Sequence, residues 1–163
     1  AEMMRMIEGR HLESTTGLFE NIRVLLEASV SVDARTDDRL PSILSRFLEL
    51  KELFEDHLAR ESRLIFPVFK SKEWVGKKGS VTRKEMLHQL DHLRRDHKDI
   101  QGLLGRIRKA SDDFQPVPSA SPSLKLCFAQ FFQLEQELNT HFFLEEEALF
   151  PRLVEELKKL SVS

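Results

Sequence analysis

The sequence predicts an all-α protein: an up-and-down antiparallel four-helix bundle formed by one domain over residues 1–163. Four segments of more than 20 residues place apolar side chains three and four positions apart, the period of an amphipathic helix. Polar, turn-forming stretches at 31–39, 71–81 and 111–121 separate these segments. No segment alternates with a period of two, so strands are not indicated. Four such helices that share one apolar interior form a bundle.

Local signals support two of the helix starts. Thr82 and Glu85 have the spacing of a capping box, in which each side chain accepts a hydrogen bond from a backbone amide at the start of the third helix. Ser121 before Pro122 places a capping residue ahead of a proline at the first position of the fourth helix.

Prolines mark expected irregularities in two helices. Proline lacks the backbone N–H and clashes with the preceding turn, so Pro67 should end or kink the second helix and Pro151 the fourth. The segment 152–160 is then expected to form a short fifth helix.

Composition excludes several classes of function. With 25 Lys and Arg against 27 Asp and Glu, the formal net charge is −2, so no basic field for nucleic acid or an anionic membrane is expected. No apolar run approaches the length of a membrane span, and Cys127 is the single cysteine, which excludes a disulfide within the chain. We expect a soluble, cytoplasmic protein; the sequence indicates no particular protein partner.

The predicted interior stripe of every helix contains a histidine, and two stripes also contain a carboxylate, which is unusual for an apolar core. The interior positions are Ile7, His11, Ser14 or Thr15, Leu18, Ile22 and Leu25 in the first helix; Leu50, Phe54, His57, Glu61 and Leu64 or Ile65 in the second; Met86, Leu90, Leu93, His97, Ile100, Leu104 and Ile107 in the third; and Phe131, Leu134, Leu138, His141, Glu145 and Leu149 in the fourth.

The two halves of the chain repeat one pattern. The segment from His57 to Pro67 aligns without a gap on the segment 141–151, so that His-x-x-x-Glu and the later Phe-Pro coincide. A lone histidine precedes each segment, His11 by 46 residues and His97 by 44. With 18 Glu in the chain, one such pair would be unremarkable, but two matching pairs indicate a common plan.

This pattern suits a centre that holds two metal ions. Residues four apart on a helix lie one above the other, about 6 Å apart, so each pair offers an imidazole and a carboxylate to the same volume. Imidazole and carboxylate donors suit iron, manganese or zinc, and burying them without a cation would be costly. In the simplest arrangement each metal takes two imidazoles and the two glutamates bridge. The candidate ligands are His11, His57, Glu61, His97, His141 and Glu145.

His88 and His92 also have a metal-ligand spacing, but they lie off the interior stripe that contains His97. We favour a solvent-facing pair over an additional ligand. Glu85 and His88 have the Glu-x-x-His spacing of ferritin-like bundles. The capping box of the third helix explains Glu85 better, so we do not favour a ferritin-like site.

The chain resembles the hemerythrin-like, or HHE cation-binding, family over residues 5–155. The residues that carry the resemblance are His11, the pair His57 and Glu61, His97 within Asp96-His97-x-x-Ile100, and the pair His141 and Glu145 followed by Leu149-Phe150-Pro151.

The resemblance implies a four-helix bundle with a non-haem centre of two iron ions joined by an oxo or hydroxo bridge. Members of the family bind oxygen, sense oxygen, iron or redox state, handle nitric oxide or peroxide, or help repair iron–sulfur clusters. The four-His, two-Glu set resembles the repair and iron-sensing branches more than the oxygen carriers, which have five histidines and a later aspartate.

Three functions remain open at this stage. The first is a di-iron protein that binds oxygen or a related small molecule for sensing, buffering or redox response, with Phe54, Phe131, Phe142 and Phe143 expected to exclude water. The second is a di-iron enzyme or repair protein that acts on peroxide or nitric oxide, or that donates iron for cluster repair. The third is a bundle whose metal, such as zinc, is only structural, or whose helices bind a partner. Glu146 and Glu147 are nearby candidates for an acid–base role in a di-iron enzyme, but we favour their interpretation as a solvated face.

Overall fold

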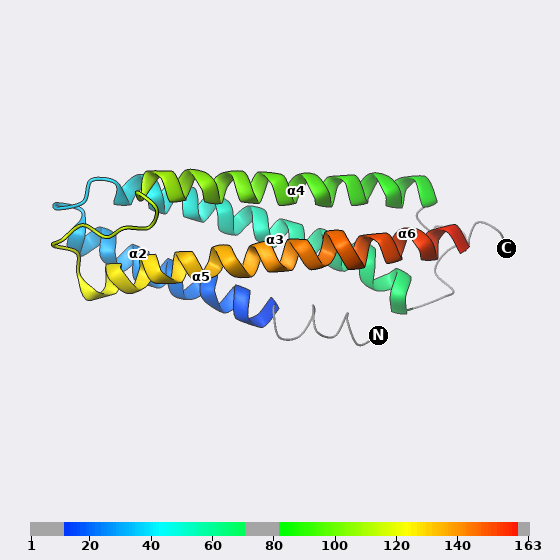
Figure 1. Cartoon of the computed structure of the whole chain (residues 1–163), viewed down its shortest axis with the longest axis horizontal. Helices are drawn as coiled ribbons and strands as arrows, with labels where there is room; N and C mark the ends of the chain where they lie inside the picture. Colours follow the sequence, from blue (N-terminus) through cyan, green and yellow to red (C-terminus); the bar gives the residue numbers. More distant parts are fainter. Residues whose placement is uncertain (1–11, 71–81, 160–163) are drawn as a thin grey trace.

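The computed structural model of the protein describes residues 12–70 and 82–159. Within these residues every regular element is a helix, the turns at 34–39 and 111–121 join them, and Figure 1 shows long helices packed side by side along one axis. The predicted all-α bundle is therefore confirmed. The elements are α2 (Leu12–Asp33), α3 (Leu40–Lys70), α4 (Arg83–Ala110), α5 (Pro122–Leu144), the π-helical turn η2 (Glu145–Leu149) and α6 (Phe150–Lys159).

The predicted fifth helix exists, but it is a continuation of the fourth. In Figure 1, α5 and α6 lie in one line, joined through η2. Pro151 lies at the start of α6, where a missing N–H is tolerated, and the irregular turn falls just before it. α3 continues through Pro67 to Lys70, and its last turns leave the line of the helix, so Pro67 does not end it.

The predicted helix starts are confirmed. The Thr82 hydroxyl accepts a hydrogen bond from the Glu85 amide at 3.2 Å, and the Glu85 carboxylate accepts one from the Thr82 amide at 2.6 Å. Ser121 caps α5 and also donates from its hydroxyl to Asp33 at 2.6 Å, which ties the end of α2 to the start of α5. Because α2 runs on to Asp33, the first loop is shorter than predicted and covers 34–39.

The predicted interior stripes agree with the observed burial. Every predicted position of α4 and of the segment 131–149 is buried. In α3 the buried residue is Ile65 rather than Leu64. In α2, Thr15 is buried whereas Ser14 is exposed, and Leu26 is buried more fully than Leu25. Ile7 and His11 lie outside the described residues.

Two apolar clusters fill the bundle, and a polar layer separates them. Phe54, Ile100, Leu138 and Phe142 lie at the edge of the larger cluster, which includes residues from α2, α3, α4 and α5. The smaller cluster comprises Ile65, Met86, Leu90, Leu93, Leu149, Phe150, Leu153 and Leu157. The sequence positions between these edges carry the buried histidines and glutamates, so the fold places the candidate ligands at one level of the bundle.

The helices do not approach each other equally. α3 packs along α4, and α2 packs along α5 and α3, whereas the backbones of α4 and α5 come together less closely. Side chains bridge this seam instead: Arg108 donates to Glu135 at 3.0 Å, and Gln101 lies 3.4 Å from Asn139. Across residues 12–70 and 82–159, none of the helices combines the length and the apolar character that crossing a membrane requires.

Candidate metal centre

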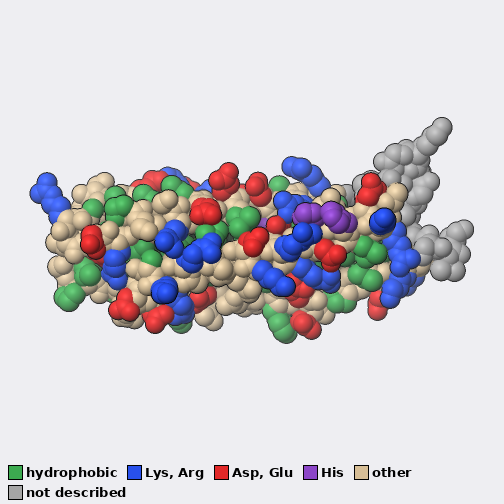
Figure 2. Space-filling view, turned by 90° about the horizontal axis from the view of Figure 1, so that it is seen from above, with side chains coloured by type: hydrophobic (Ala, Val, Ile, Leu, Met, Phe, Trp, Pro, Cys, Tyr) green, Lys and Arg blue, Asp and Glu red, His purple; other side chains and the backbone are tan. Residues whose placement is uncertain are grey.

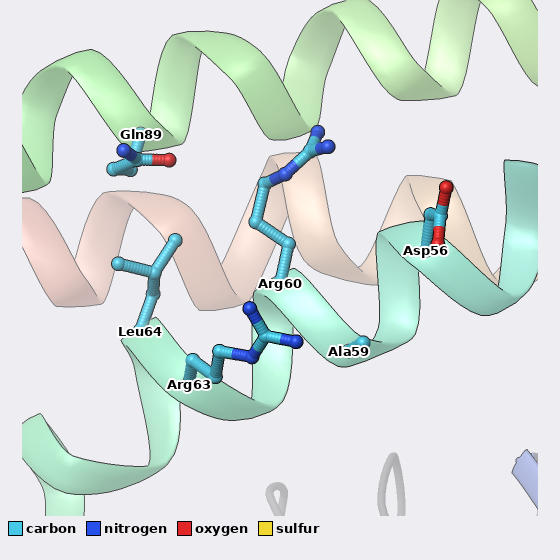
Figure 3. A pocket seen from close by; sticks show the side chains of 6 residues that line it. All are labelled: Asp56, Ala59, Arg60, Arg63, Leu64 and Gln89. Atoms are coloured by element: carbon cyan, nitrogen blue, oxygen red, sulfur yellow. The ribbon is translucent and has the colours of Figure 1, made fainter.

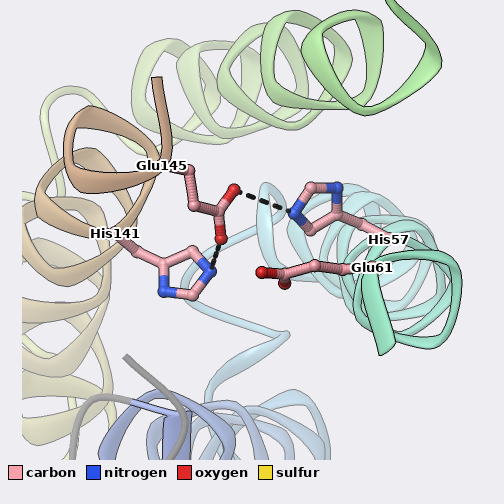
Figure 4. Close-up of side chains that lie close together, drawn as sticks. All are labelled: His57, Glu61, His141 and Glu145. Carbon is pink, nitrogen blue, oxygen red and sulfur yellow. Dashed lines mark ion pairs between the residues drawn. The ribbon is translucent and has the colours of Figure 1, made fainter. Parts of the chain in front are cut away.

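The fold gathers five of the six predicted ligands in the interior. His57 and Glu61 come from α3, His141 lies in the last turn of α5, Glu145 begins η2, and His97 comes from α4. One ligand atom from each member of the two His-x-x-x-Glu pairs lies within 4.8 Å of the others, and all four residues are buried. Figure 4 shows these four side chains converging from two helices.

Glu145 lies at the middle of the group. Its Oε2 is 2.7 Å from Nε2 of His97 and 3.5 Å from Nε2 of His57, whereas its Oε1 contacts Nε2 of His141. Figure 4 shows the carboxylate between His57 and His141, with Glu61 directed into the same space. One carboxylate therefore reaches three imidazoles from its two oxygens, which is the placement that a bridging ligand needs.

Several of these atoms lack a hydrogen-bond partner although they are fully buried. They include Nε2 of His57, Nε2 of His141 and Oε1 of Glu145, the last two in contact without the geometry of a hydrogen bond. Buried polar atoms in folded proteins are normally paired. Imidazole nitrogens and carboxylate oxygens that converge in a buried space suit a cation of the iron, manganese or zinc type. The residues present therefore fit a metal.

The pKa values of the two buried glutamates shift in opposite directions. Burial raises the pKa of Glu61 to about 7, and the negative charge of Glu145 adds to the rise. Burial opposes ionisation of Glu145 as well, but the imidazoles of His141, His57 and His97 that face its two oxygens hold its pKa well below the usual range. Without metal, the centre therefore retains a proton on Glu61 near neutral pH. Metal binding would displace such protons.

We predict that Glu61→Gln stabilises the metal-free protein at pH 8. The folded-state pKa of Glu61, about 7, lies above its ordinary value of 4.5, so this group makes stability fall as pH rises between those values. Glutamine has nearly the same shape but no charge, so the substitution removes this loss of stability. The expected increase in the free energy of unfolding at pH 8 is on the order of 2 kcal/mol. Urea unfolding of the metal-free variants at pH 5 and pH 8 measures it, with the exposed Glu52→Gln as control. An unaltered pH dependence in Glu61→Gln would contradict this.

Two arginine-held carboxylates support the imidazoles from outside. Nδ1 of His97 lies 2.8 Å from Glu146, which accepts a hydrogen bond from Arg94 at 3.2 Å. On the other side, Nδ1 of His57 lies 3.5 Å from Asp96. Arg60 lies 2.5 Å from Asp96. We call the two carboxylate–arginine pairs, Glu146 with Arg94 and Asp96 with Arg60, the outer pairs.

The outer pairs face the Nδ1 atoms of the two imidazoles. At His97, Glu146 lies within hydrogen-bond distance of Nδ1, which favours a proton there and leaves Nε2 as the lone-pair donor, as is common in metal-binding histidines. At His57, Asp96 faces Nδ1 at 3.5 Å without the geometry of a hydrogen bond. Burial alone would lower the pKa of His57, but the carboxylates of Asp96, Glu145 and Glu61 raise it to about 9. Sequence reasoning missed these residues, although Asp96 and Arg94 lie close to His97 and Arg60 lies one turn after His57.

The π-helical turn explains why Glu146 belongs to the centre. A π turn advances by a smaller angle per residue than an α-helix, and such turns are frequent at functional sites. Within η2, the consecutive residues Glu145 and Glu146 reach the two nitrogens of the same imidazole, that of His97. The interpretation of Glu146 as part of a solvated face was therefore wrong; Glu147 is exposed as expected.

Aromatic rings enclose the centre. Phe142 stacks on His97 with ring centroids 4.2 Å apart, and Phe150 stacks on the same imidazole at 5.6 Å. Phe54 contacts His57 and is fully buried. Phe131 is also buried, but the prediction that Phe143 excludes water was wrong, since 65% of it is exposed. Two residues beyond His141 on a helix, a side chain lies on the opposite face.

The remaining histidines behave differently. His88 is exposed and His92 is half-buried, with their rings 4.7 Å apart, so they form a surface pair away from the centre. Figure 2 shows histidine side chains on this face among Lys and Arg side chains. This agrees with the predicted solvent-facing pair. The sixth predicted ligand, His11, lies outside the described residues.

Comparison with known families agrees with this geometry. Residues 88–161 match the model of the hemerythrin HHE cation-binding domain. Residues 88–161 are therefore hemerythrin-like. The match includes His97, His141 and Glu145, and the fold brings His57 and Glu61 from the first half of the repeat to the same place.

Three curated relatives of this chain are named iron-sulfur cluster repair proteins. It is 27% identical over 103 residues to the iron-sulfur cluster repair protein YtfE of Edwardsiella ictaluri, covering 63% of this chain and 42% of that protein. It is 22% identical over 138 residues to the iron-sulfur cluster repair protein DnrN of Neisseria gonorrhoeae, covering 84% and 80%. It is 25% identical over 114 residues to YtfE of Escherichia coli O1:K1, covering 69% and 48%. The chain thus spans about half the length of the YtfE proteins.

Proposed function

We propose that this hemerythrin-like chain holds a non-haem di-iron centre. The observation that carries the proposal is the position of Glu145, with one oxygen toward His141 and the other toward His57 and His97. His57 and His97 would hold one ion and His141, with His11, the other. Glu145 and Glu61 would bridge the two ions. The donor set also suits manganese or zinc; the names of the relatives favour iron.

The chain's own residues would prepare such a centre. When bound, two iron ions supply one-electron redox chemistry and open coordination positions. The outer pairs would hold the imidazoles of His57 and His97 in one orientation. Phe142 and Phe150, stacked on His97, would keep water from one side of the centre.

For the role of the centre, we propose iron donation in iron–sulfur cluster repair. The relatives' printed names support this role, and so does a ligand set that differs from the five histidines of the oxygen carriers. Reversible binding of oxygen or a related small molecule, for sensing or buffering, is the second candidate. The apolar shell of Phe54, Phe142 and Phe150 favours it.

We predict that the chain retains two irons after anaerobic loading with ferrous iron and desalting, and that it transfers them to a metal-free iron–sulfur protein in the presence of cysteine-derived sulfide. Metal analysis counts the irons, and the recipient's visible absorption reports cluster assembly. The zinc-loaded chain is the control, because it cannot supply iron.

Three outcomes separate the candidates. Cluster assembly from the iron-loaded chain alone supports iron donation. No transfer, with visible bands that appear in air and disappear when oxygen is removed, supports reversible binding instead. A chain that retains no iron would contradict the di-iron centre itself.

A further inference from the structure

A groove on the α4–α5 side of the bundle leads to the candidate centre. It is a cavity of about 460 Å³ with His97 in its lining, so one candidate ligand borders on it directly. The seam between α4 and α5, where the helix backbones approach each other less closely than those of α3 and α4, contains this groove. The other lining residues are Arg94, Lys98, Gln101, Asn139, Phe142, Phe143, Glu146 and Glu147.

Side chains of the metal-binding type lie between the groove and the interior. Glu147 is exposed at the groove, and its neighbour Glu146 is only about one-third exposed. Glu146 touches Nδ1 of His97, and Nε2 of the same imidazole touches Glu145 at the middle of the group. Carboxylate and imidazole donors therefore follow one another from solvent to the centre. Arg94 holds the intermediate carboxylate by a hydrogen bond of 3.2 Å.

We propose that this groove, which we call the α4–α5 port, is the route by which divalent metal ions enter and leave the centre. The proposal rests on the proposed metal-binding function and adds the path that iron donation requires. A hydrated cation is attracted to Glu147 and is then passed to Glu146, while the positive charge of Lys98 opposes its approach. The rate of metal exchange therefore depends on the charges at this groove.

A second cavity provides an internal comparison. It has a volume of about 400 Å³ and lies between α3 and α4, lined by Asp56, Ala59, Arg60, Arg63, Leu64 and Gln89. Figure 3 shows the side chains of Arg60 and Arg63 in this cavity. None of the five gathered candidate ligands lines it. Its lining arginines disfavour a cation, and Arg60 already lies 2.5 Å from Asp96.

Stopped-flow uptake of Co²⁺ by the metal-free chain tests the port, with the ligand-field absorption of bound cobalt as the signal. Lys98→Glu should accelerate association about fivefold at low ionic strength, and Glu147→Lys should slow it by about the same factor. Arg63→Glu makes the same change of charge at the second cavity and should alter the rate by less than about twofold. Half-molar salt should remove these differences.

The outcomes distinguish the port from the centre. Normal cobalt stoichiometry with equal rates for Lys98→Glu and Arg63→Glu would overturn the port and leave the metal centre standing. The same holds if Lys98→Glu slows association, because a cation route predicts the opposite sign. Failure of the wild-type chain to bind cobalt or iron would overturn the proposed function and the port together. When a chelator removes bound cobalt, Lys98→Glu should likewise change the release rate more than Arg63→Glu.

Discussion

Replacing Glu145 by alanine is expected to leave the chain unable to retain either metal ion and to destabilise the metal-free bundle by about 3–5 kcal/mol. Glu145 is fully buried, and its two oxygens face His57, His97 and His141. Removing it leaves three buried imidazoles without the carboxylate that they face, and these imidazoles hold its pKa well below the usual range although burial raises it. No neighbouring carboxylate among the described residues occupies the same position between the imidazoles.

Metal analysis after anaerobic loading and chemical unfolding of the metal-free protein measure the two effects separately. Glu145→Gln keeps the shape of the side chain, so loss of metal in a variant that still folds assigns the loss to the missing carboxylate. Glu52→Ala, on the exposed side of α3, is the control and should change neither quantity. Retention of both irons by Glu145→Ala would refute the bridging role.

Helical periodicity is the reason that much of this arrangement could be predicted. His57 and Glu61 lie in one stripe with Phe54 and Ile65, so burial of the apolar members forces the polar members into the interior. The same reasoning applies to His97 on α4. Because such stripes specify which face is buried, the convergence of ligands from different helices followed from the sequence.

The residues that sequence reasoning missed depend on geometry beyond a single regular helix. Glu146 lies on the exposed side of an ideal α-helix, and only the π turn brings it to His97. Asp96 on α4 contacts Arg60 on α3. Predicting this contact requires the positions of the two helices relative to each other along the bundle axis, which the periodicity of a single helix does not give. The error at Phe143 has a simpler cause, since counting residues from His141 already places it outside.

Neutralising either outer carboxylate, by Asp96→Asn or Glu146→Gln, is expected to weaken metal binding by about 10- to 100-fold. Glu146 should show the larger effect, because it lies 2.8 Å from Nδ1 of His97, whereas Asp96 lies 3.5 Å from Nδ1 of His57. An amide accepts hydrogen bonds less strongly than a carboxylate, so each substitution relaxes the orientation of one imidazole and lowers its basicity as a ligand.

Competition with a chromophoric chelator measures the affinity for cobalt, and thermal unfolding of the metal-free variants checks that the fold is retained. Asp99→Asn is the matched control for Asp96→Asn, since Asp99 is exposed on the same helix one turn away. Arg94→Ala should give a smaller loss than Glu146→Gln, because the arginine acts on His97 only through Glu146. Equal affinities for Asp96→Asn, Glu146→Gln and Asp99→Asn would mean that the outer pairs stabilise the bundle without orienting the ligands.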